Sequence, residues 1–145
     1  ADASRSVHHF KDFGLQDKRF APVVGCLINS TLFYIWFIAY GNGRNVALRD
    51  ITTFPAPAGL FTEESADAFR KLFSRLMADF KKHSALRKRS DGVEFQEFYP
   101  SKSKPILDEI DTLLAKHYGF NAQELDFILN YDIKYRLGRD AGGGG

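Results

Sequence analysis

Cationic side chains are the groups in this sequence whose types and spacing could do chemistry, and they concentrate in two stretches. One stretch runs from "LRKRS" to "SKSK" (86–104), and the other is "NYDIKYRLGRD" (130–140). Exposed lysine and arginine bind phosphate groups, and tyrosine can pack or hydrogen-bond beside them. Contact with a polyanion is therefore predicted, and the candidate residues are Arg87, Lys88, Arg89, Lys102, Lys104, Lys134, Tyr135, Arg136 and Arg139.

Both stretches also have a purely structural interpretation. The basic residues Lys81, Lys82, Arg87, Lys88 and Arg89 could belong to a solvated helix end and the loop after it. Tyr131 and Tyr135 could close the core beneath the last helix. By contrast, a helix that begins near Pro105 would support phosphate binding, because the exposed backbone N–H groups at a helix start favour an anion. The residues alone leave these interpretations open.

Charge is distributed unevenly along the chain, although the formal net charge is only +2. Residues 1–69 hold six Lys/Arg against seven Asp/Glu, and residues 105–140 hold four against seven. Residues 70–104 hold ten against four, so the positive charge is concentrated there. A cluster of this kind creates a local field for a polyanion even when the total charge is small.

Enzymatic signatures are missing from the sequence. It contains no Gly-x-x-x-x-Gly-Lys-Ser/Thr phosphate loop and no Gly-x-Ser-x-Gly motif. The histidines at 83 and 117 have no metal-ligand spacing to partners. We therefore expect neither catalysis nor a cofactor nor a metal in this chain. A single cysteine, Cys26, cannot form an internal disulfide and fits a reducing, cytoplasmic location.

The elements expected in the first half are a helix, a turn and an extended segment. Val23–Tyr40 contains no charged residue and has the length of a minimal membrane span. Polar residues in its first half make insertion costly, so we expect one buried helix packed on several sides. Gly41–Asn45 predicts a turn, and Val46–Phe54 predicts a short strand or extended segment.

The middle of the chain carries a stronger helix signal. Thr62 is a predicted N-cap, and apolar residues continue at helical spacing to about Phe80. Ser84–Gly92 is expected to be a basic loop, and Val93–Pro100 an extended segment.

Two further helices are expected towards the end. The first begins near Pro105 and stops at Gly119, and its early acidic residues at 108, 109 and 111 would complement its own dipole. The second begins after Asn121, where Glu124 completes a capping box, and ends near Asn130.

These elements predict an α+β fold that is mainly helical, with long amphipathic helices and a few short strands or extended segments. We interpret residues 1–22 as an entry segment cut from a larger protein. Residues 23–140 read as one domain, and residues 141–145 as a glycine tail that we expect to be disordered.

Three short motifs resemble a known family. They are Ser-Lys-Pro-Ile (103–106), His-Tyr-Gly-Phe (117–120) and Asn-Tyr-Asp-Ile-Lys-Tyr-Arg (130–136). Leu27–Asn45, ahead of Phe54-Pro55-Ala56-Pro57, is similar to the same family. In this order they resemble the C-terminal, target-recognition region of type II (type IIG-like) restriction–modification adenine-specific DNA methyltransferases. The resemblance extends from Leu27 to Arg139.

The chain departs from that family in its catalytic motifs. It has no Pro-Pro, so the Asn/Asp-Pro-Pro-Tyr/Phe motif that holds the flipped adenine is absent. It also lacks a glycine-rich loop for S-adenosylmethionine and a Pro-Asp…Glu-x-Lys nuclease signature. The resemblance thus implies a fragment downstream of the catalytic domain, with S-adenosylmethionine expected only in the parent enzyme.

The resemblance implies that this fragment grips double-stranded DNA while the parent's own upstream methyltransferase domain modifies the base. The alternative is a non-catalytic structural or interaction module that packs against that domain or a partner subunit. The positive segment 70–104 favours DNA binding, whereas the apolar stretch 23–40 favours packing. A third alternative is a small membrane-associated protein built on that stretch.

Overall fold

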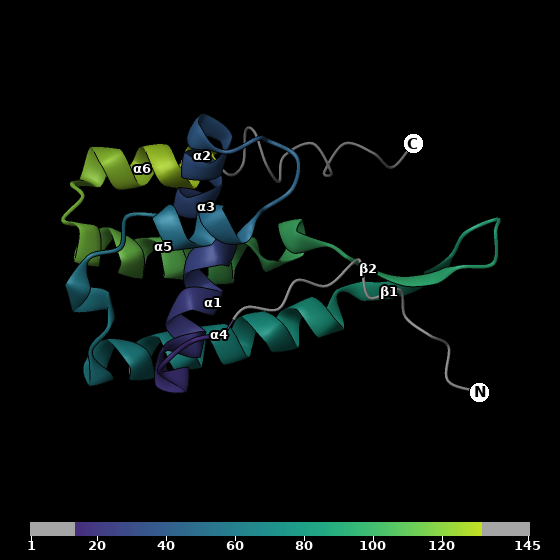
Figure 1. The fold of residues 1–145 in the computed structure, drawn as a ribbon, viewed down its shortest axis with the longest axis horizontal. Coiled ribbons are helices and arrows are strands. Elements are labelled where there is room, and N and C mark those ends of the chain that lie inside the picture. Colours follow the sequence, from purple (N-terminus) through teal and green to yellow (C-terminus); the bar gives the residue numbers. More distant parts are fainter. Residues whose placement is uncertain (1–13, 132–145) are drawn as a thin grey trace.

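The computed structural model describes residues 14–131, and this part contains six α-helices and one two-stranded antiparallel sheet (Figure 1). The mainly helical α+β fold is therefore confirmed. The helices are α1 (Ala21–Asn29), α2 (Thr31–Tyr40), α3 (Leu48–Thr53), α4 (Glu63–Lys82), α5 (Lys104–Tyr118) and α6 (Ala122–Tyr131). The strands are β1 (Ser84–Lys88) and β2 (Glu94–Phe98), and 3-10 turns lie at η2 (Lys18–Phe20), η3 (Ala58–Leu60) and η4 (Pro100–Ser103).

The core lies where α1 crosses α4 and α5 (Figure 1). Its largest fully buried side chains come from these helices and from η3: Val23, Cys26, Leu60, Phe69, Leu76, Leu107, Ile110 and Leu114. Gly25 allows the close approach of α1 to α4, because a Cβ atom there would lie 2.4 Å from Cε2 of Phe73. The missing side chain is thus needed for packing.

The predicted single helix over Val23–Tyr40 is wrong, because the chain bends by 65° between α1 and α2. Ser30 takes an extended conformation at the break and caps α2, and its Oγ accepts a hydrogen bond from the Phe33 N–H at 3.0 Å. No single helix within residues 14–131 is long and apolar enough to cross a membrane. Lys18–Asn29 and Thr31–Tyr40 reach that length and composition only as a bent pair.

A carboxylate from α5 caps the first turn of α2. Asp111 is 1% exposed, and its Oδ1 accepts hydrogen bonds from the backbone N–H groups of Thr31 at 3.0 Å and Leu32 at 3.3 Å. The first N–H groups of a helix have no partner within the helix, so a buried start needs such an acceptor. This corrects the expectation that Asp111 serves the dipole of its own helix.

The predicted strand or extended segment at Val46–Phe54 is also wrong, because Leu48–Thr53 forms α3. Asp50 Oδ2 accepts a hydrogen bond from the Ala47 N–H at 2.7 Å and begins the helix. Ile51 packs against the core and Phe54 is buried. β-Branched residues favour strands only where a neighbouring strand is available, and here packing against the helices decides the conformation.

The starts and stops predicted for the remaining helices are confirmed. Thr62 Oγ1 accepts a hydrogen bond from the Ser65 N–H at 3.2 Å, which caps α4. Gly119 ends α5 with a positive φ of 71°. Asn121 and Glu124 form the capping box of α6 with hydrogen bonds of 2.9 and 2.8 Å.

The expected basic loop at Ser84–Gly92 is in part a strand, because Ser84–Lys88 is β1 and pairs with the expected extended segment, β2. Ser84 faces Phe98 and Lys88 faces Glu94 in the register. Gly92, with a φ of 86°, closes the turn. Figure 1 shows that this β-hairpin projects from the end of α4 beyond the helices.

Candidate nucleic-acid interface

The foot of the β-hairpin is attached to the last turn of α4. Ser103, which is fully buried, donates a hydrogen bond from Oγ to Asp79 Oδ2 at 2.6 Å. His83 Nδ1 lies 3.2 Å from the same oxygen, and the Tyr99 N–H donates to the His83 carbonyl at 3.1 Å. The Ser103 hydrogen bond, followed by His83 and by the positive charge of Lys82, lowers the pKa of Asp79. These contacts fix the orientation of the hairpin relative to α4.

Three polar side chains brace one face of the hairpin. Arg87 Nε contacts Glu97 Oε2 at 2.9 Å, and its Nη2 donates to Tyr99 Oη at 2.9 Å. Tyr99 Oη donates to Glu97 Oε2 at 2.6 Å, closing the triangle. The pKa of Glu97 is lowered by the Tyr99 and Arg87 hydrogen bonds, and that of Arg87 is raised chiefly by Glu97. Arg87 is therefore engaged within the hairpin.

Two other candidate cations are also engaged. Arg89 Nη2 lies 3.3 Å from Asp91 Oδ2 at the turn of the hairpin. Lys104 is only 16% exposed; its Nζ pairs with Asp108 and donates to the Leu129 carbonyl at 3.3 Å, joining α5 to α6. Lys104 consequently serves helix packing.

The remaining two described candidates are available to a ligand. Lys88 and Lys102 are exposed, and their side chains form no ion pair or hydrogen bond with another residue of the described part, 14–131. The two lie on different elements, Lys88 on β1 and Lys102 on η4.

Three exposed lysines of α4 lie outside the nine candidate residues, and of these only Lys71 was not considered from the sequence. Lys71, Lys81 and Lys82 are exposed on α4, and within residues 14–131 their side chains form no ion pair or hydrogen bond either. Lys71 and Lys82 are eleven residues apart, about three helical turns, so they share the face of α4 opposite the core residue Phe69. That spacing is present in the sequence and could have revealed Lys71.

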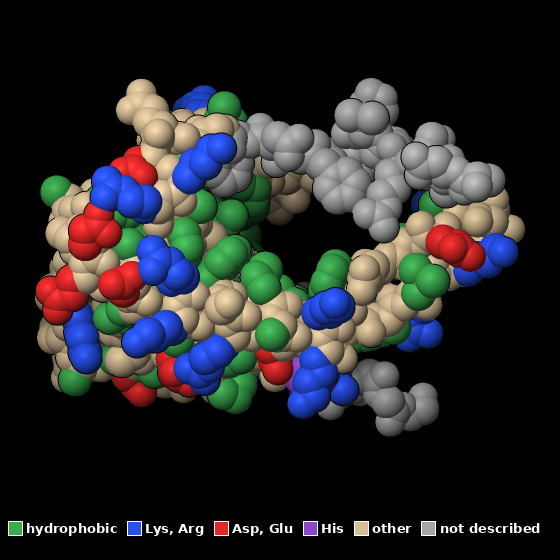
Figure 2. Space-filling model, turned by 90° about the horizontal axis from the view of Figure 1, so that it is seen from below, with side chains coloured by type: hydrophobic (Ala, Val, Ile, Leu, Met, Phe, Trp, Pro, Cys, Tyr) green, Lys and Arg blue, Asp and Glu red, His purple; other side chains and the backbone are tan. Residues whose placement is uncertain are grey.

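Lys81, Lys82 and Lys102 lie near the foot of the hairpin, and Lys71 lies about three helical turns back along α4. Because η4 contacts the end of α4, Lys102 joins the lysines of the helix. Figure 2 shows Lys and Arg side chains following one another along the face formed by α4 and reaching the hairpin. We call Lys71, Lys81, Lys82 and Lys102 the cationic surface.

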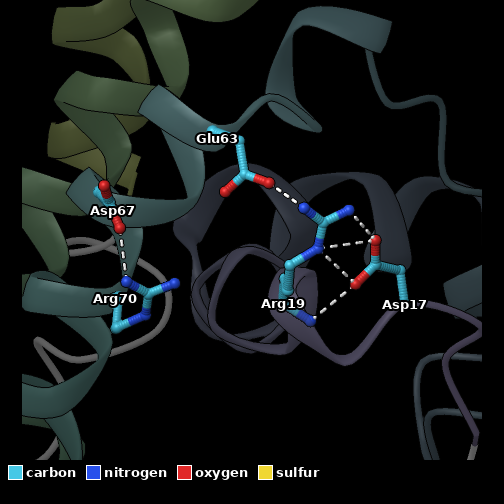
Figure 3. A network of polar contacts seen from close by, with 5 residues as sticks. All are labelled: Asp17, Arg19, Glu63, Asp67 and Arg70. Atoms are coloured by element: carbon cyan, nitrogen blue, oxygen red, sulfur yellow. Dashed lines mark hydrogen bonds and ion pairs between the residues drawn. The ribbon is translucent and has the colours of Figure 1, made fainter.

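The opposite end of α4 is charged but neutralised (Figure 3). Arg19 forms ion pairs with Glu63 and with Asp17, the latter at 2.6 Å. One turn further along, Arg70 pairs with Asp67. The Asp17 and Glu63 carboxylates raise the pKa of Arg19, with the Asp17 hydrogen bond as the largest cause. Arg19 and Arg70 thus already have anionic partners.

The second predicted stretch lies mostly outside the described residues. Lys134, Tyr135, Arg136 and Arg139 belong to residues 132–145. The helix that leads to them, α6, buries Ile128, which is 5% exposed. The Tyr131 ring lies 6.3 Å from Tyr34 and 5.7 Å from Phe127, so it packs against α2 and against its own helix outside the main core cluster.

Groups that could act in catalysis are engaged in structural contacts. The Ser65 hydroxyl donates to the Gly59 carbonyl at 2.9 Å, so its proton is not directed at His117, which lies 3.4 Å away. Burial raises the pKa of the Cys26 thiol to about 12, which keeps it protonated and poorly nucleophilic. Among residues 14–131, no group of three His, Cys, Asp or Glu side chains could hold a metal ion.

Two shallow depressions lie on the described part of the chain. One of about 490 Å³ lies between α2 and α6 and is mainly apolar, with Leu32, Ile35 and Phe127 in its lining. The other, of about 410 Å³, contains Asp108 and Glu109, which pair with Lys104 and Arg75. Binding through charge is what the described arrangement can do best.

No family model matches this chain, and neither a curated protein nor a solved structure was found to be similar to it.

Proposed function

We propose that this chain is a non-catalytic, DNA-binding specificity fragment of an adenine-N6 DNA methyltransferase or restriction–modification enzyme. The cationic surface carries this proposal. Its four lysines are exposed and lack ion-pair partners within residues 14–131, whereas Arg19 and Arg70 towards the other end of α4 are paired. The motifs at 103–106, 117–120 and 130–136 support the choice of enzyme class.

A duplex is the polyanion that suits a surface of this kind. Lysines along a rigid helix lose less freedom on meeting phosphate than lysines in a flexible tail. Phosphate contacts set the orientation and register of a protein on DNA without reading its sequence. The cationic surface would therefore position the duplex for the methyltransferase domain that we place upstream and that would hold S-adenosylmethionine.

Neutralising the cationic surface tests this proposal. The variant replaces Lys71, Lys81, Lys82 and Lys102 by Gln, and its affinity for a short duplex of mixed sequence is measured against salt concentration. Each lost phosphate contact reduces the slope of log affinity against log salt by about 0.9, so a slope shallower by roughly three to four is expected. Affinity should fall by a similar factor for all sequences.

A matched control removes the same charge elsewhere. Lys18, Arg44, Arg49 and Lys116 are also exposed, and replacing all four by Gln changes the net charge equally. This control should change the slope by less than about one unit. Equal slopes for the two variants would show that binding follows net charge alone and would contradict the cationic surface as the DNA site.

An interaction module is the second candidate, and a separate surface favours it. Four large apolar side chains are exposed around the end of α2 and the start of α3: Ile38 (43%), Tyr40 (77%), Val46 (36%) and Leu48 (56%). Contiguous exposed apolar residues mark protein contacts. In a Tyr40→Ser/Leu48→Ser variant, weaker binding to the parent methyltransferase domain with unchanged DNA affinity would support packing here.

A further inference from the structure

One face of the β-hairpin carries the side-chain types that read DNA bases. In the β1–β2 register, Leu86 faces Gln96 and Lys88 faces Glu94. Since side chains alternate between the two faces of a strand, all four lie on the same face. We call Leu86, Lys88, Glu94 and Gln96 the reading face. Arg87 and Glu97 lie on the other face and pair with each other.

We propose that the reading face enters the major groove of duplex DNA and recognises base edges, an inference that rests on the proposed DNA-binding function. The chemistry of its members covers the base pairs. In the major groove lysine donates to guanine, glutamine pairs with adenine, glutamate accepts from cytosine, and an apolar side chain contacts the thymine methyl group.

The reading face is open to a ligand. Its four side chains are all exposed, and Leu86 is 71% exposed. Gln96 is oriented by a hydrogen bond of 2.7 Å from its Nε2 to Ser84 Oγ. An amide nitrogen has two hydrogens and the amide oxygen accepts, so donor and acceptor capacity remains for a base.

The dimensions of the hairpin suit the groove. Two paired strands are about 4.8 Å apart, and the major groove is about 12 Å wide and admits a two-stranded ribbon. The two residue pairs of the reading face are about 7 Å apart along the strands, which matches roughly two base-pair steps of 3.4 Å. Phe98 at the foot of the same face packs against Phe80 of α4. The hairpin projects clear of the helices, so its approach to a groove is not blocked by them (Figure 1).

The foot of the hairpin supplies the positioning that base reading requires. Lys81, Lys82 and Lys102 lie where the hairpin leaves the helices and would contact the phosphates that border the groove. The Ser103–Asp79 hydrogen bond fixes the hairpin to α4, and the Arg87–Glu97 pair braces its other face. Phosphate contacts would therefore set the register, and the reading face would specify the sequence.

Selection from a pool of duplexes with a randomised centre tests the inference, using the full 145-residue chain. The wild type and single variants Lys88→Ala, Glu94→Ala and Gln96→Ala are each used to select, and the bound DNA is sequenced. The matched control is Phe95→Thr, which truncates an exposed side chain on the opposite face of β2. Thermal melting checks that every variant folds.

We expect the wild type to enrich a short motif and each of the three variants to lose its preference at one or two positions of that motif. Discrimination at those positions should fall about tenfold, the usual scale for one base contact. The Phe95→Thr control should select the wild-type motif.

Different outcomes separate this inference from the proposed function. If the wild type binds duplexes with the expected salt dependence but enriches no motif, the reading face is overturned and the proposed function stands. If all three variants select the wild-type motif, the reading face is likewise overturned and the proposed function stands. That result is expected if the hairpin docks on a protein instead of DNA. A wild type that binds no duplex overturns both.

Discussion

The two ends of α4 have similar numbers of charged residues but very different surroundings. At the first end, Arg19 and Arg70 pair with Glu63 and Asp67, and the helix start is capped by Thr62. At the far end, Lys81 and Lys82 are exposed beside the foot of the β-hairpin without an ion pair in the described part of the chain. Charge pairing, rather than the number of cations, distinguishes a solvated helix end from a candidate binding surface.

The largest change in duplex affinity is expected when the charge at the far end of α4 is reversed. A Lys81→Glu/Lys82→Glu variant should lower duplex affinity by about a hundredfold or more, because two attractive contacts become repulsive. A control with Lys18→Glu/Arg49→Glu makes the same change in net charge away from the cationic surface. Affinities measured at one salt concentration check this, and equal losses in the two variants would remove the contrast between the ends.

Packing of α4 against α1 should be separable from DNA binding. In Gly25→Ala the new Cβ atom would meet the Phe73 ring, so we expect the free energy of unfolding to fall by about 1–2 kcal/mol despite the better helix propensity of alanine. Urea unfolding measures the loss. The salt slope of DNA binding below the melting transition should stay unchanged.

The foot of the hairpin should depend on one hydroxyl. Ser103→Ala removes the hydrogen bond to Asp79, and we expect a loss of about 1–2 kcal/mol in the free energy of unfolding. Faster amide hydrogen exchange of Tyr99 and Val93, with unchanged exchange in α1, would show that the loosening is local. Exchange that increases equally throughout would instead indicate a general loss of stability.

We expect low pH to weaken the Ser103–Asp79 hydrogen bond. Because the folded-state pKa of Asp79 is lowered by Ser103 and His83, its contribution to stability is present above the unfolded pKa of about 4 and is lost as pH falls through the folded pKa. The difference in melting temperature between the wild type and Ser103→Ala should therefore shrink from pH 6 towards pH 3. A difference that is constant with pH would mean that the ionised form of Asp79 is not what Ser103 stabilises.

The smallest effect is expected at the neutralised end. Arg70 and Asp67 are both more than half exposed, and a surface pair of this kind contributes about 0.5 kcal/mol or less. Arg70→Gln should leave both the melting temperature and the salt slope nearly unchanged. A shallower slope in this variant would extend the DNA site along the whole of α4.

Local signals in the sequence were sufficient for the long helices. Thr62 begins α4, Gly119 ends α5, and Asn121 with Glu124 begins α6, each as predicted. These residues act on the backbone within one turn of themselves, so neighbours in the sequence are enough to predict them. The same holds for the cationic composition of residues 70–104.

Other features depend on residues far apart in the chain. The break at Ser30 is stabilised by Asp111, eighty residues beyond Thr31, and no local pattern in Val23–Tyr40 contains that partner. Likewise, α3 forms where a strand was predicted because the neighbouring helices provide a surface for Ile51.

The candidate site shows the same division. The sequence by itself determined that cations concentrate in residues 70–104 and that Lys71 and Lys82 share a helix face. The local ion pairs Arg89–Asp91 and Lys104–Asp108 join residues two and four apart, so their spacing is present in the sequence. Only the tertiary structure decided that Arg87 is engaged, because its pairing with Glu97 follows from the strand register, and that Lys104 also contacts the Leu129 carbonyl of α6. An ion pair requires two groups within about 4 Å, and for residues that are not neighbours in the sequence, folding sets that distance.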